Sequence, residues 1–272
     1  MNLRQGGIET DFEFKLGLNK VPEVTLYFWI IKILCTTTGE TGADYLIENF
    51  LGLVNTTYFM SILLLLIIYI QFKVKKYTPI IYWSVVVFLS VVGTLITDLL
   101  TDKFHVSLVT SSFAFSLALG GTFLTWFISE KTLSIHSIKS KKRELFYWLT
   151  ILFTFSLGTA LGDLVAEKYS LGYLTSTYIF LGIIALITII FFIARFFASS
   201  SKVVLNSGGV LAFWLAYIFT RPLGASIGDY LSQARNLGGL GLGTTSTSLV
   251  FLSIILVLVI FLSLTKKDQI KY

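Results

Sequence analysis

The chain alternates between long apolar runs and short polar segments, and eight of the apolar runs have the length of membrane-spanning helices. Four runs contain a tryptophan, small residues and one aspartate, and we expect helices at about residues 24–46, 79–100, 145–167 and 208–231. Four others are more aliphatic, and we expect helices at about residues 55–73, 106–129, 175–199 and 246–265. Roughly 20 apolar residues in a helix cross a hydrocarbon core about 30 Å thick. The pattern therefore predicts an all-α membrane protein with eight transmembrane helices.

The first set of helices shares one motif, in which a glycine follows the tryptophan by ten residues and an aspartate follows it by fifteen. The four copies are Trp29/Gly39/Asp44, Trp83/Gly93/Asp98, Trp148/Gly158/Asp163 and Trp214/Gly224/Asp229. With one motif helix and one aliphatic helix each, the repeats span residues 23–76, 77–140, 141–202 and 203–267, between cytoplasmic tails at 1–22 and 268–272. Two crossings per repeat make all four parallel, which predicts helical hairpins in a pseudo-fourfold arrangement.

Composition and charge agree with a membrane protein and indicate its orientation. The chain is 55% hydrophobic and 13% charged, whereas soluble domains are about 25% charged. Sixteen lysines and arginines fall on the tryptophan side, against Lys103, Lys168 and Arg235 on the aspartate side. Because basic residues favour the cytoplasmic side, we expect both termini to be cytoplasmic and the aspartates to lie toward the outside. The net charge of +6 is then explained by topology and lipid headgroups, without a nucleic-acid partner.

Hydroxyl and amide residues recur in the outer loops, twelve positions after three of the motif aspartates. Thr56, Thr110 and Thr175 mark these clusters, and Thr244 begins a similar one in the fourth repeat. Because serine, threonine and asparagine are common helix N-caps, we expect these clusters to begin the aliphatic helices.

In this fourfold register the chain resembles a family of bacterial inner-membrane proteins built from four tandem repeats, each with two membrane helices and a characteristic tryptophan. The resemblance extends from about Val24 to Leu264. It implies the architecture predicted above and a multi-pass location in the bacterial cytoplasmic (inner) membrane. The repeat is known as one of unknown function, so activity has to be inferred from the residues.

One face of each motif helix carries the residues at positions 3, 7, 11 and 15 after the tryptophan. These stripes are Lys32/Thr36/Glu40/Asp44, Val86/Ser90/Thr94/Asp98, Ile151/Phe155/Thr159/Asp163 and Tyr217/Arg221/Ala225/Asp229. The additional charges occur only in repeats 1 and 4, which predicts a charged track where these repeats meet. We expect Arg221 to pair with Glu40, with Lys32 lower on the same track. Pro222 should kink its helix and free a backbone carbonyl, which makes it a candidate gate.

The carboxylates of this track are candidate ligands for a cation. Glu40 and Asp44 are one turn apart, so they either share a proton or hold a cation. The predicted ligand set is Glu40, Asp44 and Asp229, helped by Thr36 and Thr37, with Asp98 and Asp163 completing the ring. Oxygen ligands suit Mn²⁺, Mg²⁺, Ca²⁺, Na⁺ or H⁺ better than Cu⁺ or Zn²⁺. Two structural alternatives stay open: the aspartates are caps at the membrane interface, with the tryptophans in an aromatic belt, and a basic residue neutralises Glu40.

These residues favour a transporter of a small cation, first of all a divalent metal such as Mn²⁺ or Mg²⁺, with Lys32 and Arg221 neutralising the empty site in an exchange cycle that includes export. One alternative is a passive channel or carrier for a small anion that uses the same two basic residues. Another is a non-transporting membrane scaffold or sensor. Motifs of hydrolases, nucleotide binding and thiol chemistry are absent, and Cys35 is the single cysteine, so we expect neither an enzyme nor a covalent cofactor. The expected partners are the lipid bilayer and a small inorganic ion.

Overall fold

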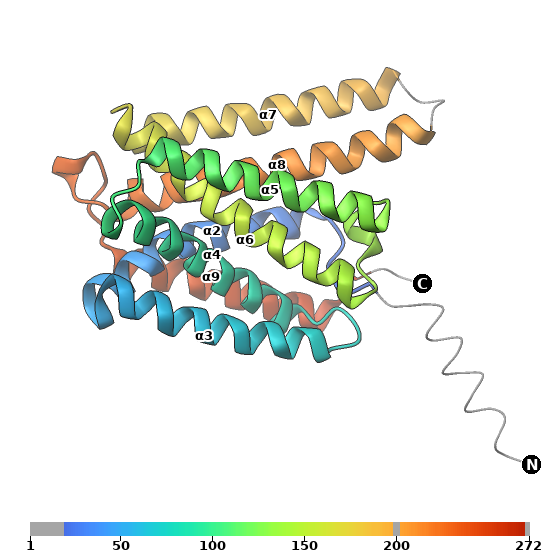
Figure 1. Cartoon of the computed structure of the whole chain (residues 1–272), viewed down its shortest axis with the longest axis horizontal. Helices are drawn as coiled ribbons and strands as arrows, with labels where there is room; N and C mark the ends of the chain where they lie inside the picture. The colour runs from blue at the N-terminus through green and yellow to red at the C-terminus, as the bar shows by residue number, and fades with distance from the viewer. Residues whose placement is uncertain (1–18, 198–201, 270–272) are drawn as a thin grey trace, which may run out of the picture.

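The computed structural model describes residues 19–197 and 202–269, with side chains from residue 207 onward in the second range, and the regular elements among these residues are all helices. The motif helices are α2 (Leu26–Leu46), α4 (Pro79–Asp98), α6 (Lys141–Asp163) and α8 (Lys202–Ser232). They alternate with α3 (Gly52–Lys73), α5 (Leu108–Glu130), α7 (Tyr173–Phe197) and α9 (Thr244–Thr265) (Figure 1). Each predicted range overlaps one of these helices. Residues 198–199 of a predicted helix and tail residues 1–18 and 270–272 lie outside the described part.

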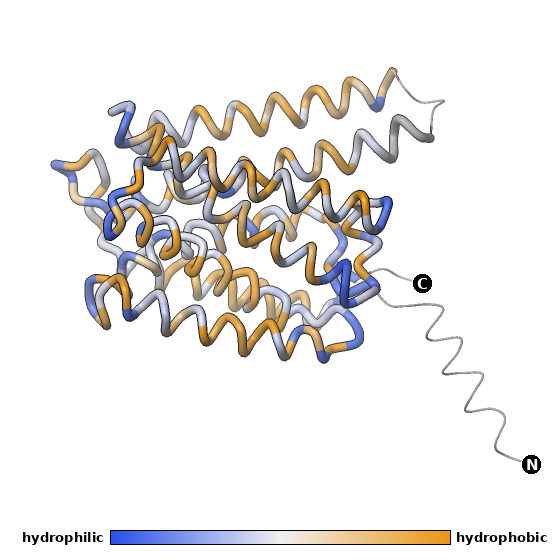
Figure 2. The backbone as a smooth tube through the Cα atoms, viewed as in Figure 1, coloured by the Kyte–Doolittle hydropathy of each residue, from blue (hydrophilic) through white to orange (hydrophobic). Residues whose placement is uncertain are grey.

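Seven helical stretches among the described residues are long and apolar enough to cross a membrane. The first, Leu26–Lys73, contains α2, a π-helical turn η1 (Ile47–Leu51) and α3, and the chain reverses direction within it (Figure 1). Gly52 follows the π turn with φ of 68°, a conformation that glycine adopts without a steric cost. We call the four aliphatic helices, α3, α5, α7 and α9, the outer helices. Apolar residues predominate along them, while polar residues gather at the two ends of the bundle (Figure 2). The chain is therefore a multi-pass helical membrane protein.

The motif helices form a closed ring, in which α2 contacts α4, α4 contacts α6, α6 contacts α8, and α8 contacts α2. The motif glycine lies at each of these contacts. An added Cβ would come within 2.9 Å of the Ser90 carbonyl carbon at Gly39, 2.7 Å of Phe155 Cβ at Gly93, 2.6 Å of Arg221 Cβ at Gly158, and 2.6 Å of Thr36 Cβ at Gly224. The recurring glycine therefore lets the backbones of neighbouring motif helices approach closely.

The outer helices pack on the motif helix that follows them in the chain. Helix α3 packs on α4, α5 on α6, and α7 on α8, while α9 packs on α2 and so closes the ring. The sequence-based division instead paired the two helices within each repeat. The observed pairs are joined by the loops at the tryptophan end, or by the two chain ends, where the Glu23 amide donates to the Asp268 carbonyl at 2.9 Å. Each aliphatic helix thus connects one repeat to the next.

Aromatic rings join the same four helices at the tryptophan end. The residue before each tryptophan packs on the next tryptophan: Phe28–Trp83 at 5.6 Å, Tyr82–Trp148 at 5.4 Å, Tyr147–Trp214 at 6.2 Å and Phe213–Trp29 at 5.7 Å between ring centroids. Trp83, Trp148 and Trp214 are buried. For these three, the interpretation as a lipid-facing aromatic belt is wrong, because contacts between motif helices remove them from the surface.

The hydroxyl clusters do not cap the aliphatic helices as we expected. Helix α3 begins after Leu51 and α9 after Gly243, neither of which makes a side-chain cap. Helix α5 is capped by Ser107, whose Oγ accepts a hydrogen bond from the Thr110 amide at 3.1 Å. Helices α3, α5 and α7 therefore begin two or three residues before their clusters, whereas α9 begins at Thr244, the first residue of its cluster. Thr57 is already inside α3, donating to the Leu53 carbonyl at 2.8 Å.

The described part of the predicted N-terminal tail is buried under the tryptophan end. Lys20 donates to Glu144 at 2.6 Å, and both side chains are at least nine-tenths buried. The Tyr77 amide donates to the Asn19 carbonyl at 3.2 Å, and the Tyr77 hydroxyl donates to Asp268 at 2.5 Å. Residues from both ends of the described chain therefore close this end of the ring.

Candidate cation site

The predicted stripes face the interior of the ring. All of their residues are buried, except for three half-buried aspartates, Asp44, Asp98 and Asp163. Lys32 and its equivalents lie nearest the aromatic layer, and the aspartates lie at the opposite end. The axis of the ring therefore passes from aromatic rings through mixed polar residues to carboxylates.

Arg221 links all four motif helices at one level of the ring. Its side chain is 0% exposed, and its Nη2 lies 2.9 Å from Glu40 Oε2 and 2.8 Å from Thr159 Oγ1. The same nitrogen donates to Thr94, and Nη1 donates to the Thr36 carbonyl at 3.5 Å. The predicted Arg221–Glu40 pair is confirmed. We call this layer the floor, because it lies directly beneath a cavity.

Lys32 lies on the other side of the floor and is also fully buried. Its amine donates to the Tyr217 carbonyl at 3.2 Å. It also lies 4.4 Å from the centre of the Tyr217 ring and 4.9 Å from that of Phe155. Its place lower on the charged track is as predicted. Among the described residues it forms no ion pair, so aromatic faces and a carbonyl are its surroundings.

Pro222 does not break helix α8. The helix is continuous from Lys202 to Ser232 and contains Pro222 in its interior. The proline ring packs close to α6, where a Cβ on Gly158 would lie 3.0 Å from Pro222 Cδ. Contacts with the neighbouring helix therefore hold this part of α8 in place, and α8 is not interrupted at Pro222. The kink and the freed carbonyl stay predictions.

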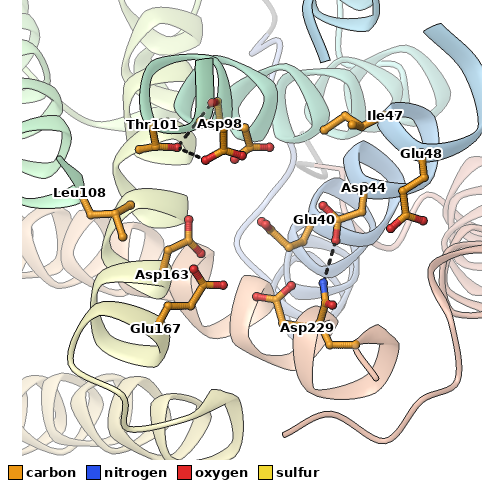
Figure 3. Close-up of a pocket in the computed structure, with 12 residues that line it drawn as sticks. Glu40, Asp44, Ile47, Glu48, Asp98, Thr101, Leu108, Asp163, Glu167 and Asp229 are labelled. Carbon is orange, nitrogen blue, oxygen red and sulfur yellow. Dashed lines mark hydrogen bonds between the residues drawn. The ribbon is translucent and has the colours of Figure 1, made fainter. Parts of the chain in front are cut away.

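Above the floor, the ring opens into a cavity of about 290 Å³, which we call the cup. Its lining residues are Glu40, Asp44, Ile47, Glu48, Asp98, Thr101, Asp102, Leu108, Asp163, Glu167, Asp229 and Gln233 (Figure 3). Eight of these twelve residues carry a carboxylate, and none is basic. Carboxyl groups from different motif helices thus share one concave site.

Three of the acids at the mouth of the cup were missed by the sequence analysis. Glu48, Asp102 and Glu167 each follow a motif aspartate by four residues. They lie in π-helical turns, η1, η2 (Leu99–Lys103) and η4 (Leu164–Lys168). Gln233 occupies the same register in the fourth repeat and donates to Asp44 at 3.3 Å. Extending the motif by four residues would have found them, but acids at predicted helix ends are usually only solvated.

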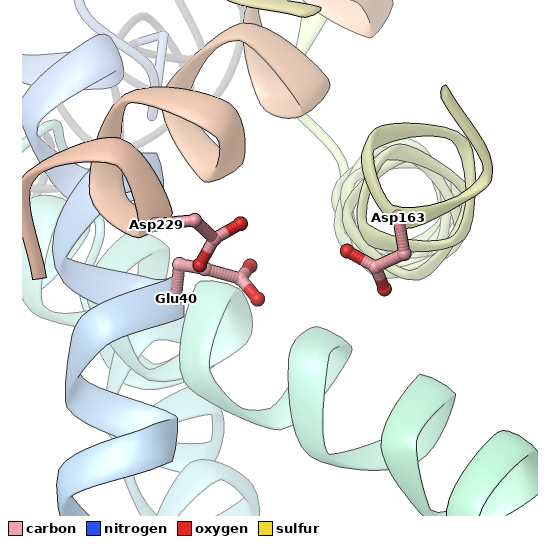
Figure 4. Close-up of side chains that lie close together, drawn as sticks. All are labelled: Glu40, Asp163 and Asp229. Carbon is pink, nitrogen blue, oxygen red and sulfur yellow. The ribbon is translucent and has the colours of Figure 1, made fainter. Parts of the chain in front are cut away.

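At the base of the cup, Glu40, Asp163 and Asp229 each offer a carboxylate oxygen, and these oxygens lie within 4.8 Å of one another (Figure 4). Asp229 is 7% exposed, and its carboxylate has no hydrogen-bond or ion-pair partner among the described residues. The predicted ligands Asp44 and Asp98 line the same cavity. This arrangement of hard oxygen atoms could hold a metal ion.

The two predicted hydroxyl ligands lie outside the cup. Thr36 Oγ1 donates to the Ile33 carbonyl at 2.8 Å and to the Thr220 carbonyl at 3.3 Å. Thr37 Oγ1 donates to Ile33 at 3.1 Å. Both hydroxyls therefore donate to backbone carbonyls of α2 or α8 and do not face the cup. They lie where α2 approaches α8 at Gly224.

The fold and the site together define a helical repeat membrane protein with an acidic cavity at the centre of its ring of motif helices. The chain matches the family described as "Repeat of Unknown Function (DUF347)" over residues 27–77, 81–132, 146–196 and 212–268. These matches cover most of the chain, which therefore belongs to this repeat family. No curated protein and no solved structure shows significant similarity to it.

Proposed function

We propose that this protein transports a small inorganic cation across the membrane and binds it between Glu40, Asp163 and Asp229. The observation that carries this proposal is the convergence of these carboxylates in a cavity inside the ring of motif helices, with Asp229 buried and without a partner among the described residues. Ionisable groups inside a membrane are costly and usually serve an ion or proton pathway. An oxygen-only ligand set favours Mn²⁺, Mg²⁺ or Ca²⁺. The cup has no aromatic lining of the kind that binds quaternary ammonium groups.

The proposed topology has eight crossings, with α2 and α3 counted separately, and a pseudo-fourfold axis along the membrane normal. The repeated glycine and aromatic contacts around the ring support this symmetry. The excess of basic residues on the tryptophan side supports cytoplasmic termini in a bacterial inner membrane. The cup would then face the outside, and the floor and the aromatic layer would separate it from the cytoplasm.

Arg221 gives this site a competing internal cation. Its guanidinium is bonded to Glu40, one of the three proposed ligands. A bound metal ion would compete with Arg221 for this carboxylate, and release of the guanidinium would loosen its bonds to the other motif helices. Arg221 would thus couple cation binding to opening of the floor, with Lys32 as the next positive charge along the axis. This is the exchange cycle that the charge pattern predicts.

The proposal is tested by Mn²⁺ flux into proteoliposomes that contain the purified full-length chain. Asp163→Asn and Asp229→Asn should each reduce flux by more than about tenfold, because each removes one ligand charge. Glu130→Gln is the matched control, since this acid pairs with Arg143 at 2.8 Å at the end of α5, on the tryptophan side. Glu40→Gln is a poorer test, because it also leaves the buried Arg221 without its carboxylate. Wild-type flux in both aspartate variants would contradict the proposal.

The same measurements separate the alternatives. A small-anion carrier would need Arg221 to be available, but the guanidinium is paired with Glu40 and lies beneath eight carboxylates. A sensor would show Mn²⁺-dependent thermal stabilisation without flux. A scaffold would show neither stabilisation by Mn²⁺ nor flux. Flux together with stabilisation, both lost on changing Asp163 or Asp229, is the result expected for a transporter.

A further inference from the structure

We propose that this protein exchanges the metal ion for protons and that Lys32 is the group that carries the proton. This inference rests on the proposed transport and deepens it, because it names the counter-ion of the exchange cycle. It also gives a role to the buried basic residue that forms no ion pair among the described residues.

The Lys32 amine lies across the centre of the ring, between the floor and the aromatic layer. It extends from α2 to within 4.9 Å of the centre of the Phe155 ring on α6, and 4.4 Å of that of Tyr217 on α8. Helix α6 is opposite α2 in the ring, since both are neighbours of α4 and of α8. A cation that leaves the cup through the floor therefore has to pass this amine before it reaches the tryptophan end.

The titratable groups around Lys32 do not neutralise its charge. Helix α8 contributes Arg221, which is positive, and Tyr217, while α2 itself contributes the buried Cys35. Tyrosine and cysteine are ordinarily neutral at pH 7. The equivalents of Lys32 on α4 and α6 are apolar, and α9 contains no titratable residue from Thr244 to Thr265. A protonated amine here has one carbonyl and two aromatic faces as partners, near a second positive charge.

Lysine and arginine differ in what they can do inside the ring. The Arg221 guanidinium keeps its charge at every physiological pH, and its hydrogen bonds already go to the three other motif helices. An amine can release its proton, and the neutral form no longer repels a metal ion. Lys32 is therefore the basic residue of the axis whose charge can alternate during transport.

The exchange follows from these two charge states of Lys32. A divalent ion passes the amine when it is neutral, and the amine takes up a proton once the ion has left. The proton leaves to the side from which the metal ion enters, and the next proton comes from the side to which the metal ion departs. One divalent ion thus moves against one proton, and each cycle carries one net positive charge.

Buried hydroxyls beyond Lys32 can pass protons to the tryptophan end. The Tyr217 hydroxyl is buried and has no hydrogen-bond partner among the described residues. One helical turn nearer the tryptophan end, the Tyr82 and Tyr147 hydroxyls form a hydrogen bond of 2.5 Å in which either oxygen can be the donor. A hydroxyl both donates and accepts, so it can pass a proton on, whereas the rings around it leave a hydrated metal ion little room.

The test is accumulation of Mn²⁺ in vesicles that contain the purified full-length chain and begin with equal Mn²⁺ on both sides. Potassium and valinomycin hold the membrane potential near zero, and the vesicle interior is made acidic. Because protons leave down their gradient, the wild type should accumulate Mn²⁺ inside several-fold. Vesicles with equal pH on both sides should show no accumulation.

Two substitutions of Lys32 separate a proton carrier from a merely structural residue. Lys32→Arg fixes the positive charge and should reduce Mn²⁺ flux by more than about tenfold. Lys32→Met removes the charge and should let Mn²⁺ move down its own gradient, but an acidic interior should no longer cause accumulation. A structural role predicts the opposite order, since arginine is the more conservative change. Lys142→Met is the matched control, because Lys142 is exposed at the tryptophan end, and it should accumulate Mn²⁺ like the wild type.

A measurement on the wild type keeps the test decisive if Lys32→Met does not fold. A pH-sensitive dye trapped in the vesicles should report a rise of internal pH when Mn²⁺ is added outside, and Asp229→Asn should abolish this rise. Folding of the Lys32 variants is checked by their stabilisation with Mn²⁺, because the cup lies on the other side of the floor. Loss of downhill flux in a Lys32→Met protein that still binds Mn²⁺ would overturn the assignment to Lys32.

The two proposals fail in different ways. Wild-type Mn²⁺ flux that ignores the pH difference and moves no protons would refute proton exchange and leave the proposed transport intact. Coupled transport in Lys32→Arg, or accumulation by Lys32→Met equal to that of the wild type, would overturn the role of Lys32. A chain without Mn²⁺ flux under either gradient would refute both proposals.

Discussion

At the scale of single residues, the glycines of the motif decide how closely the helices of the ring approach each other. Helix α2 carries two glycines three residues apart that differ in this respect. A Cβ on Gly39 would lie 2.9 Å from the Ser90 carbonyl carbon, whereas the nearest atom to a Cβ on Gly42 is Val91 Cγ2 at 3.9 Å. Only the first position therefore requires the absence of a side chain.

Gly39→Ala should lower the stability of the folded state by about 1–3 kcal/mol, because the added methyl group forces α2 and α4 apart. Gly42→Ala is the matched control and should be neutral or stabilising by up to about 1 kcal/mol, since alanine favours the helix. Thermal unfolding in detergent measures both changes. Equal effects of the two substitutions would show that close packing at Gly39 is not limiting.

At the scale of elements, the segment after α9 is held to the loop between α3 and α4 by one polar contact. Burial raises the pKa of the Tyr77 hydroxyl, which therefore stays protonated and donates to Asp268. Burial also raises the pKa of Asp268, against the opposing effect of this hydrogen bond. The folded state thus binds the Asp268 proton more tightly than the unfolded chain does.

A raised pKa in the folded state gives stability that is present below the ordinary aspartate pKa of about 3.9 and is lost as pH rises through the folded value. Wild type should therefore lose apparent melting temperature relative to Asp268→Asn as pH rises from about 4 to 7. Melting curves of both proteins at each pH, in one detergent, measure this difference. A difference that is constant or changes in the opposite direction would contradict the assignment to Asp268.

At the scale of the whole molecule, α9 has the role that α3, α5 and α7 have elsewhere, since it covers the motif helix of the next repeat around the ring. The first motif helix, α2, is covered by the last helix of the described chain, α9. Both ends of the described chain meet at the tryptophan end, through Glu23 and Asp268. The stability of the ring therefore depends on the contact between α9 and α2 more than on the order of the repeats along the chain.

A circular permutant should fold if residue 269 is joined to residue 19 by a short linker and the chain is opened between Phe197 and Lys202. All helix pairs are kept, and the new ends stay on the same side of the bundle. The unpermuted chain ended before α9, at residue 243, is the control, and it should give aggregates because one face of α2 is uncovered. Size-exclusion chromatography in detergent distinguishes these outcomes, and a monodisperse control would show that closure by α9 is dispensable.

The sequence by itself determined the helices, the repeat and part of the site, because these follow from local periodicity. Apolar runs of fixed length located the helices, and a glycine that recurs ten residues after tryptophan identified the contact face. The stripe rule placed Arg221 and Glu40 on the inner faces of adjoining repeats, one helical turn apart in register, and the long arginine side chain spans that turn. The cation-binding role of these residues stays a prediction.

Only the tertiary structure decided which helices pair, which side chains line the cup, and where the aromatic residues lie. Helix pairing depends on contacts between distant segments, which periodicity does not encode. Thr36 and Thr37 have the right chemistry for ligands, but neighbouring helix carbonyls accept their hydrogen bonds. Glu48, Asp102 and Glu167 line the cup because the π-helical turns at the ends of three motif helices surround a common space. Local sequence sets the face on which a side chain lies, whereas packing of the whole ring sets what that face meets.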